Sequence, residues 1–185
     1  MKIKISNKEY IGQCNTLSYI FYKKIFKTNI LRDLDKLRIT LINISEDKAN
    51  AQEIADFYEI LIKMIYILIY TKNQEVESFE KWTKEIKIND LTEELINETI
   101  ETLLNAFVDE DVTKELEKIP NTNAKESIFP EHDFLRICLE YRLNLQDLSL
   151  LTYIDIIKIF LSANQKEQRN TIKKATQSDI DRLLS

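Results

Sequence analysis

The sequence predicts a mainly helical protein, in which a short N-terminal β-hairpin is followed by a helical bundle domain and a small C-terminal helical unit. Three observations predict this fold class. The 185 residues include one glycine and two prolines, too few for a Rossmann fold or for a sheet joined by many tight turns. Apolar residues alternate over the first dozen positions and then recur at helical spacing. A polar, proline-containing stretch separates the last third of the chain from the rest.

The alternation at the start of the chain predicts a β-hairpin. Ile3 and Ile5 precede the turn-forming sequence SNK at residues 6–8, and Tyr10 and Gly12 follow it. Two short apolar-polar runs around an asparagine-containing turn are typical of paired antiparallel strands. We therefore expect both strands to lie before residue 13.

Two helices are predicted after the hairpin. Asn15 and Thr16 provide a cap for apolar residues that recur at helical spacing up to about Lys27. Residues 30–44 fit a helix through their leucines, whereas their isoleucine-rich second half also fits a strand. The helix is favoured there, and the strand is the alternative.

The strongest helical pattern covers residues 46–71, with Ser45 as the expected cap. Its apolar residues extend well beyond one stripe and include Tyr66 and Tyr70. Such a helix is either the central helix of the bundle or part of an oligomer interface. We expect this surplus apolar surface to make the protein a homo-oligomer, with Tyr66 and Tyr70 as candidate partner-binding residues.

The next predicted helix, capped by Asn89 and Asp90, ends at Phe107, and a linker-like composition follows it. The predicted domains are therefore 1–118 (hairpin plus helical domain), 119–128 (linker) and 129–185 (small helical domain). Residues 119–185 carry nine basic and nine acidic side chains, so all of the net charge of -5 belongs to the first part. Because the core-forming elements precede the linker, the first domain is expected to fold without the second.

The C-terminal unit restarts at Pro130 and Glu131, residue types that suit the first turn of a helix. Leucines and one tyrosine are expected to be exposed around a short turn later in this unit. These candidate partner-binding residues are Leu143, Leu145, Leu148 and Tyr153. Ordinary packing between helices is the alternative role for them.

Catalytic and metal-binding signatures are absent from the sequence. The only histidine is His132, and Cys138, six residues later, falls about 240° away around a helix, so the two do not converge on zinc. The glutamates between residues 93 and 101 lack the Glu-x-x-His pairs of a di-iron bundle. No nucleophile elbow or Walker lysine occurs either. We therefore expect no enzyme activity, no catalytic residue, no cofactor and no metal.

Charge and hydropathy narrow the compartment and the partners. An acidic chain without a dense Lys/Arg cluster has little attraction for nucleic acid or for an anionic membrane. The most apolar run, at residues 60–70, is too short to span a bilayer. Cys14 and Cys138 have no paired spacing and are expected to be reduced thiols in a cytosol.

Several stretches, in this order, resemble one family. They are KIKISNKEY (2–10), TLSYIFYKKIF (16–26) and ILRDL (30–34); SFEKW (78–82) with INDL (88–91); and FLRIC (134–138) with LNLQDLSLLT (143–152). The first group resembles the opening of the tail assembly chaperones of long-tailed bacteriophages and phage-tail-like particles. The second resembles the middle of the same proteins. The third is similar to the small downstream domain that such chaperones often gain by translational frameshifting.

The resemblance implies a function without catalysis. A tail assembly chaperone holds the tape-measure protein soluble and extended, and it brings tail-tube subunits to it in the cytoplasm of the bacterial host. The acidic first domain then becomes the expected tape-measure surface, and the C-terminal unit the expected tube-protein contact. A small helical adaptor or regulator is the competing class, although no helix carries the basic face that a DNA-binding regulator needs.

Overall fold

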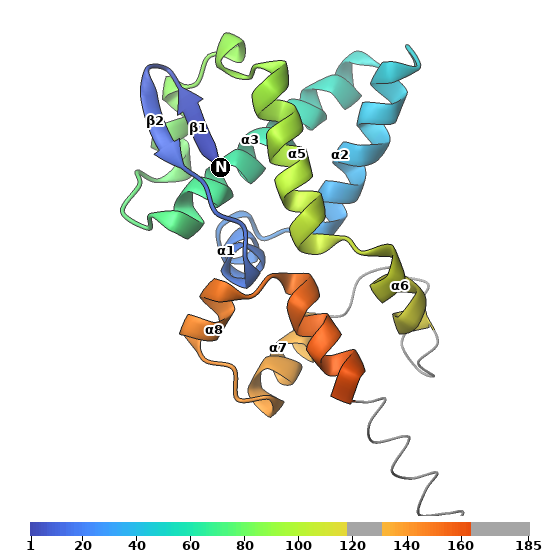
Figure 1. Ribbon diagram of the computed structural model, residues 1–185. Helices are drawn as coiled ribbons and strands as arrows, with labels where there is room; N and C mark the ends of the chain where they lie inside the picture. The colour runs from blue at the N-terminus through green and yellow to red at the C-terminus, as the bar shows by residue number, and fades with distance from the viewer. Residues whose placement is uncertain (118–130, 164–185) are drawn as a thin grey trace, which may run out of the picture. The chain divides into compact units, whose positions relative to one another are not determined.

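The computed structural model describes residues 1–117 and 131–163, except for the side chains of residues 115–117 and 131–133 (Figure 1). The fold is mainly helical with an N-terminal two-stranded hairpin, as predicted. The chain forms two compact units, Met1–Asp109 with Leu143–Tyr153, and Glu110–Arg142 with Ile154–Ser185. The C-terminal region predicted as one domain from residue 129 therefore contributes to both units. The predicted linker, 119–128, lies outside the described residues.

The hairpin consists of β1 (Lys2–Ile5) and β2 (Lys8–Ile11), which pair antiparallel with Ile3 opposite Tyr10. The two turn residues, Ser6 and Asn7, have φ angles of 46° and 66°, the left-handed values that a two-residue hairpin turn requires. Ile3 and Ile5 are both buried. The predicted hairpin is confirmed, and its two isoleucines face the core.

The chain's only glycine follows β2 at a point of close approach. A Cβ atom on Gly12 would lie 2.6 Å from Ile3 Cδ1 and 3.2 Å from Leu68 Cβ. The backbone at this position also exchanges hydrogen bonds with Met1 and so closes the open end of the hairpin. Gly12 thus lets the hairpin lie directly against the helix that contains Leu68.

Helix α1 (Thr16–Phe26) begins where the sequence predicts. The side chain of Asn15 accepts a hydrogen bond from the Leu17 N–H, and Ser18 completes a capping box. Helix α2 (Ile30–Ser45) follows, capped by Asn29, so the helix favoured for residues 30–44 is confirmed and the strand alternative is wrong.

The long helix starts later than predicted. Helix α3 covers Ala51–Lys72, and Asn50 forms a capping box with Glu53. Ser45 is instead the last residue of α2. Its hydroxyl donates to the Ile42 carbonyl one turn back, 2.8 Å away, so it does not cap α3. The left-handed Asp47, with φ 54°, lies in the turn that separates the two helices.

Helix α3 is the central helix of the bundle. This is the first of the two roles predicted for its broad apolar surface, the other being an oligomer interface. Ten of its residues are buried, and Leu61, Met64, Ile65, Ile67 and Leu68 have no exposed surface. The helix packs against β2, α1, α2 and α5 (Figure 1). Little apolar surface of α3 is therefore left for self-association. The formation of a homo-oligomer stays a prediction.

Short elements connect α3 to the next long helix: α4 (Phe79–Trp82), η1 (Thr83–Glu85) and η2 (Ile88–Asp90). Helix α5 (Glu93–Phe107) is capped by Thr92, so the prediction of a cap at Asn89 and Asp90 was wrong. The Asp90 carboxylate instead accepts hydrogen bonds from the Ser6 hydroxyl, at 2.5 Å, and from the Lys87 N–H, and these bonds lower the pKa of Asp90. This contact ties the hairpin turn to η2.

The later helices belong to both units. In the second unit, α6 covers Glu110–Glu117 and α7 covers Glu131–Glu140, and Phe134 and Ile137 of α7 are buried. Helix α8 (Leu145–Leu150) belongs to the first unit. A further helix covers residues 153–163, and its first residue, Tyr153, is the last residue of the first unit.

The close approach of Gly12 to Ile3 and Leu68 allows a test of the hairpin contact. Gly12→Ala should lower the free energy of unfolding by about 1–3 kcal/mol, because the added methyl overlaps Ile3 Cδ1. Ile3→Val alone should cost about 0.5–1.5 kcal/mol. The double variant should cost clearly less than the sum, since valine lacks the Cδ1 atom, and guanidinium denaturation measures all three. Strict additivity of the two changes would contradict this account of Gly12.

Candidate functional site

An aromatic cluster connects α1, α3 and α4 in the first unit. Tyr66 lies at its centre, with ring centroids 5.3 Å from both Phe79 and Trp82 and 5.8 Å from Tyr70. Most of the pairs are tilted or edge-to-face, which is the favourable arrangement for aromatic rings. The cluster consists of Phe21, Phe26, Tyr66, Tyr70, Phe79 and Trp82.

Burial divides this aromatic cluster into a base and a rim. Tyr66 and Trp82 form the base, each 2% exposed. The Tyr66 hydroxyl donates to the Glu77 carbonyl at 3.0 Å, and burial raises the pKa of this tyrosine. The aromatic rim, Phe21, Phe26, Tyr70 and Phe79, is half-buried. Of the two tyrosines predicted as partner-binding, Tyr66 is therefore a core residue and Tyr70 a surface-reaching one.

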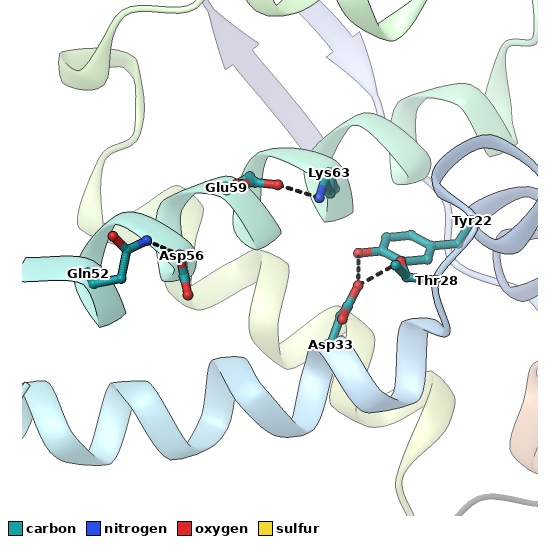
Figure 2. Close-up of polar contacts among 7 residues, drawn as sticks. All are labelled: Tyr22, Thr28, Asp33, Gln52, Asp56, Glu59 and Lys63. Atoms are coloured by element: carbon teal, nitrogen blue, oxygen red, sulfur yellow. Dashed lines mark hydrogen bonds and ion pairs between the residues drawn. The ribbon is translucent and has the colours of Figure 1, made fainter.

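A lysine next to the aromatic rim adds charge. Lys63 Nζ lies 6.0 Å from the centroid of the Phe26 ring, and it pairs with the Glu59 carboxylate at 2.5 Å (Figure 2). Both side chains belong to α3, one turn apart. The ion pair places both signs of charge beside the aromatic rim, so this apolar surface has a polar margin on the α3 side.

A buried carboxylate joins α1 to α2. Asp33, 5% exposed, accepts hydrogen bonds from the Tyr22 hydroxyl at 2.8 Å and from the Thr28 hydroxyl at 2.9 Å (Figure 2). Burial, together with the neighbouring negative charge of Asp33, raises the pKa of Tyr22. This network was not predicted from the sequence, although an aspartate on the apolar face of α2, beside Leu34, was a usable signal. Its hydrogen bonds connect α1, the following turn and α2.

The segment that contains α8 is held at the N-terminus of α1. The Ser149 carbonyl accepts hydrogen bonds from the Asn15 amide at 2.8 Å and from the Gln13 amide at 3.3 Å. The Leu151 carbonyl accepts from both the N–H and the hydroxyl of Thr16, at 2.9 and 2.8 Å. Residues separated by more than 130 positions in the sequence thus share one polar contact.

Aromatic packing completes this contact. The Tyr153 ring lies 5.2 Å from Tyr19 and 5.9 Å from Phe107, and Tyr153 is 5% exposed. Leu148 is buried as well. The expectation that Leu148 and Tyr153 are exposed around a turn is therefore not met, because both side chains pack into the first unit.

Helix α8 carries two exposed leucines, which lie about 140° apart around its axis. Leu145 is 74% exposed and Leu150 is 73% exposed, whereas Leu143 is half-buried. Asn144 caps the helix with Asp147 as its capping-box partner, so the position of Leu145 is well defined. Leu145 and Leu143 are thus the two predicted contact residues of this segment that reach the surface, and Leu150 was not among those predicted. A role of any of them in binding stays a prediction.

Metal-binding and membrane-spanning features were also searched for in the described residues. Residues 1–117 and 131–163 contain no group of three or more His, Cys, Asp or Glu side chains placed to hold a metal ion. In the same residues, no helix is long and apolar enough to cross a membrane. Burial raises the pKa of the Cys14 thiol to about 12, so this thiol stays protonated and unreactive at neutral pH.

Comparisons with known proteins add no relative. No family model matches the chain, and neither does any curated protein or solved structure. A proposal for the function therefore depends on the sequence resemblance, on the aromatic rim and on the exposed leucines of α8.

The buried Tyr22–Asp33 contact predicts a pH dependence. Tyr22→Phe should lower the free energy of unfolding at pH 7 by about 1–3 kcal/mol. An ordinary tyrosine ionises near pH 10 when unfolded, whereas folded Tyr22 keeps its proton, so its contribution is complete below pH 10 and is lost as the pH rises further. Denaturation between about pH 8 and pH 11.5 should show the difference between native and variant shrinking above pH 10.

Thr28→Ala is the matched control for this experiment. It removes the other donor to Asp33 but no titrating group, so its cost should stay constant over the same pH range. A difference between native and Tyr22→Phe that is equally constant would contradict the assignment.

The contacts that residues 149–153 make with α1 and α5 predict how a truncated chain should behave. Residues 1–118 should stay helical and unfold cooperatively, because α3 and the elements around it precede the cut. The midpoint Tm should fall relative to the full chain, since Tyr19, Phe107 and the α1 N-terminus lose their contacts with residues 149–153. Circular dichroism measures both, and a peptide of residues 143–153 added at high concentration should raise Tm again. Loss of cooperative unfolding in the fragment would show that this segment completes the core.

Proposed function

We propose that this protein is a tail assembly chaperone, which binds the tape-measure protein of a phage tail or tail-like particle and recruits tail-tube subunits to it. The single observation that carries the proposal is the aromatic rim, Phe21, Phe26, Tyr70 and Phe79, half-buried on a well-packed base. The proposed protein acts by binding alone, without catalysis, in the cytoplasm of the bacterial host.

Aromatic rings held at a surface are effective anchors for an apolar partner. They bury a large area, lose little conformational entropy, and are enriched among the residues that dominate binding energy. Here the base residues Tyr66 and Trp82 contact three of the four rim rings, with centroid distances of 5.3–6.5 Å. A pre-ordered rim of this kind suits the apolar stripe of an amphipathic helix. A tape-measure protein is a long helical rod that presents such stripes.

The charge of the chain supports the same proposal. All of the net charge of -5 falls within residues 1–118. A complex between an apolar rod and several acidic chaperones stays soluble through mutual repulsion. The segment around α8 provides further exposed apolar side chains within the first unit, those of Leu145 and Leu150. We assign the recruitment of tube subunits to this segment.

Co-expression with a candidate tape-measure protein, sought as a very long reading frame next to the gene, tests the proposal. The native chain should raise the soluble fraction of the tape measure, and Tyr70→Glu should reduce that gain by about fivefold or more, as expected for loss of an aromatic anchor worth at least about 1 kcal/mol. Tyr70 is half-buried, so the variant should retain its helical circular dichroism.

Tyr58→Glu is the matched control. Tyr58 has the same side chain on the same helix and is also half-buried, but its ring contacts Phe57 and lies outside the aromatic cluster. The Tyr58→Glu variant should therefore leave the soluble yield of the tape measure at the native level. The proposed function is rejected if the native chain does not solubilise the tape measure; equal losses in the two variants would reject only the aromatic rim as its binding surface.

A further inference from the structure

The outward face of α2 carries two exposed isoleucines. Ile39 is 54% exposed and Ile42 is 50% exposed, whereas Ile30, Leu34 and Leu37 on the opposite face are buried. Figure 1 shows α2 along one edge of the first unit. Single exposed apolar residues are common, but a neighbouring pair on one helical face is a candidate contact.

The charges along this face have a regular order. Arg32, Ile39 and Glu46 are spaced seven residues apart and fall within about 40° of one another around the helix axis. Asp35 and Ile42 lie beside them, one turn further along. Arg32, Asp35 and Glu46 are all exposed. The face therefore has an apolar centre, a basic residue two turns before it and an acidic residue two turns after it.

We propose that this face binds a second copy of the same chain, as an antiparallel α2–α2 pair with Ile39 on the two-fold axis. In that arrangement Arg32 of each copy faces Glu46 of the other, so one interface contains two equivalent ion pairs. Ile39 of one copy packs against Ile39 of the other, and Ile42 lies beside this contact. A two-fold axis requires such a self-complementary surface.

The same charges disfavour the other pairings. A parallel pair of α2 helices would place Arg32 against Arg32 and Glu46 against Glu46. An antiparallel pair centred between Ile39 and Ile42 would place Asp35 against Glu46. Like charges facing each other are unfavourable, so charge order selects both the direction and the register of the pair.

The intrachain ion pairs of this region do not compete strongly. Lys48 Nζ lies 2.6 Å from the Glu46 carboxylate, and the Arg38 guanidinium lies 3.7 Å from the Asp35 carboxylate. The side chains in both pairs are at least half exposed. Exposed pairs of this kind contribute little, so Glu46 is able to exchange Lys48 for an arginine of the second copy, or to contact both.

The size of the interface sets the expected affinity. Helix α2 has 16 residues, about 24 Å in length, and a single pair of such helices buries less than the roughly 1,200 Å² at the lower end of stable interfaces. We therefore expect a reversible dimer with a Kd on the order of 10–100 μM, a typical strength for a transient contact. This inference is independent of the proposed function, since it concerns the purified chain alone.

Sedimentation equilibrium of the full chain between about 5 and 500 μM tests the proposal. The native chain should change from monomer to dimer over this range. Arg32→Glu should weaken the dimer about tenfold or more, because the introduced glutamate then faces Glu46 of the other copy, and Glu46→Arg should do the same by placing arginines together. The double variant restores opposite charges and should return the Kd to within about threefold of the native value. All four chains should share one circular dichroism spectrum, since every change is on an exposed helical or turn position.

A cross-linking experiment tests the position of the axis. A residue on a two-fold axis lies beside its own copy, so Ile39→Cys should form a disulfide-linked dimer under mild oxidation. The native chain, which keeps Cys14 and Cys138, and Lys24→Cys, at an exposed position of α1, are the controls and should stay monomeric on a non-reducing gel. A native chain that is monomeric at about 500 μM overturns the proposal. So does a dimer that Arg32→Glu leaves intact, because the contact must then use another surface.

Discussion

The burial of α3 is the constraint on which the rest of the first unit depends. A helix that is apolar on nearly all sides must be covered on nearly all sides, and no single neighbour can do this. The hairpin, α1, α2 and α5 each take a different side of α3. The close packing of the hairpin explains why the one glycine of the chain lies at residue 12, where any Cβ atom would collide with Ile3. The aromatic cluster has the same origin, because rings of α1 and α4 contact Tyr66 and Tyr70 of α3, and Tyr66 is buried whereas Tyr70 stays partly exposed.

The length of α3 also determines where apolar side chains are left exposed. Its 22 residues extend for about 33 Å, and its first six are not buried. Helix α2 likewise has its buried residues in its first half, up to Leu37. The ends of both helices that lie next to their connecting turn therefore carry half-exposed isoleucines, Ile39 and Ile42 on α2 and Ile54 on α3. These residues are accessible because the remaining elements of the first unit cover only the other half of the helix pair.

Local signals in the sequence were sufficient for most elements but not for their exact starts. Asn15 was predicted correctly as a cap, because it stands directly before the apolar pattern of α1. Ser45 and Asp90 were predicted wrongly, since each has good capping chemistry but makes a different bond: Ser45 to its own helix and Asp90 to the hairpin turn. The choice among several polar residues depends on tertiary contacts that a sequence pattern does not contain. The burial of Leu148 and Tyr153 was missed for the same reason, because the ring partners of Tyr153 lie in α1 and α5 and α8 packs against α1.

The contact between α1 and the segment after α8 shows why such long-range docking leaves so little trace in a sequence. On one side the acceptors are backbone carbonyls, those of Ser149 and Leu151 at the end of a helix, and every residue type has one. On the other side the donors, Gln13, Asn15 and Thr16, are residues that a helix start uses for its own cap. One of these bonds joins the Thr16 N–H, at the start of α1, to the Leu151 carbonyl at the end of α8, an arrangement that the partial charges of both helix ends favour. Specificity at this contact must then come from Tyr153, whose ring fits between Tyr19 and Phe107.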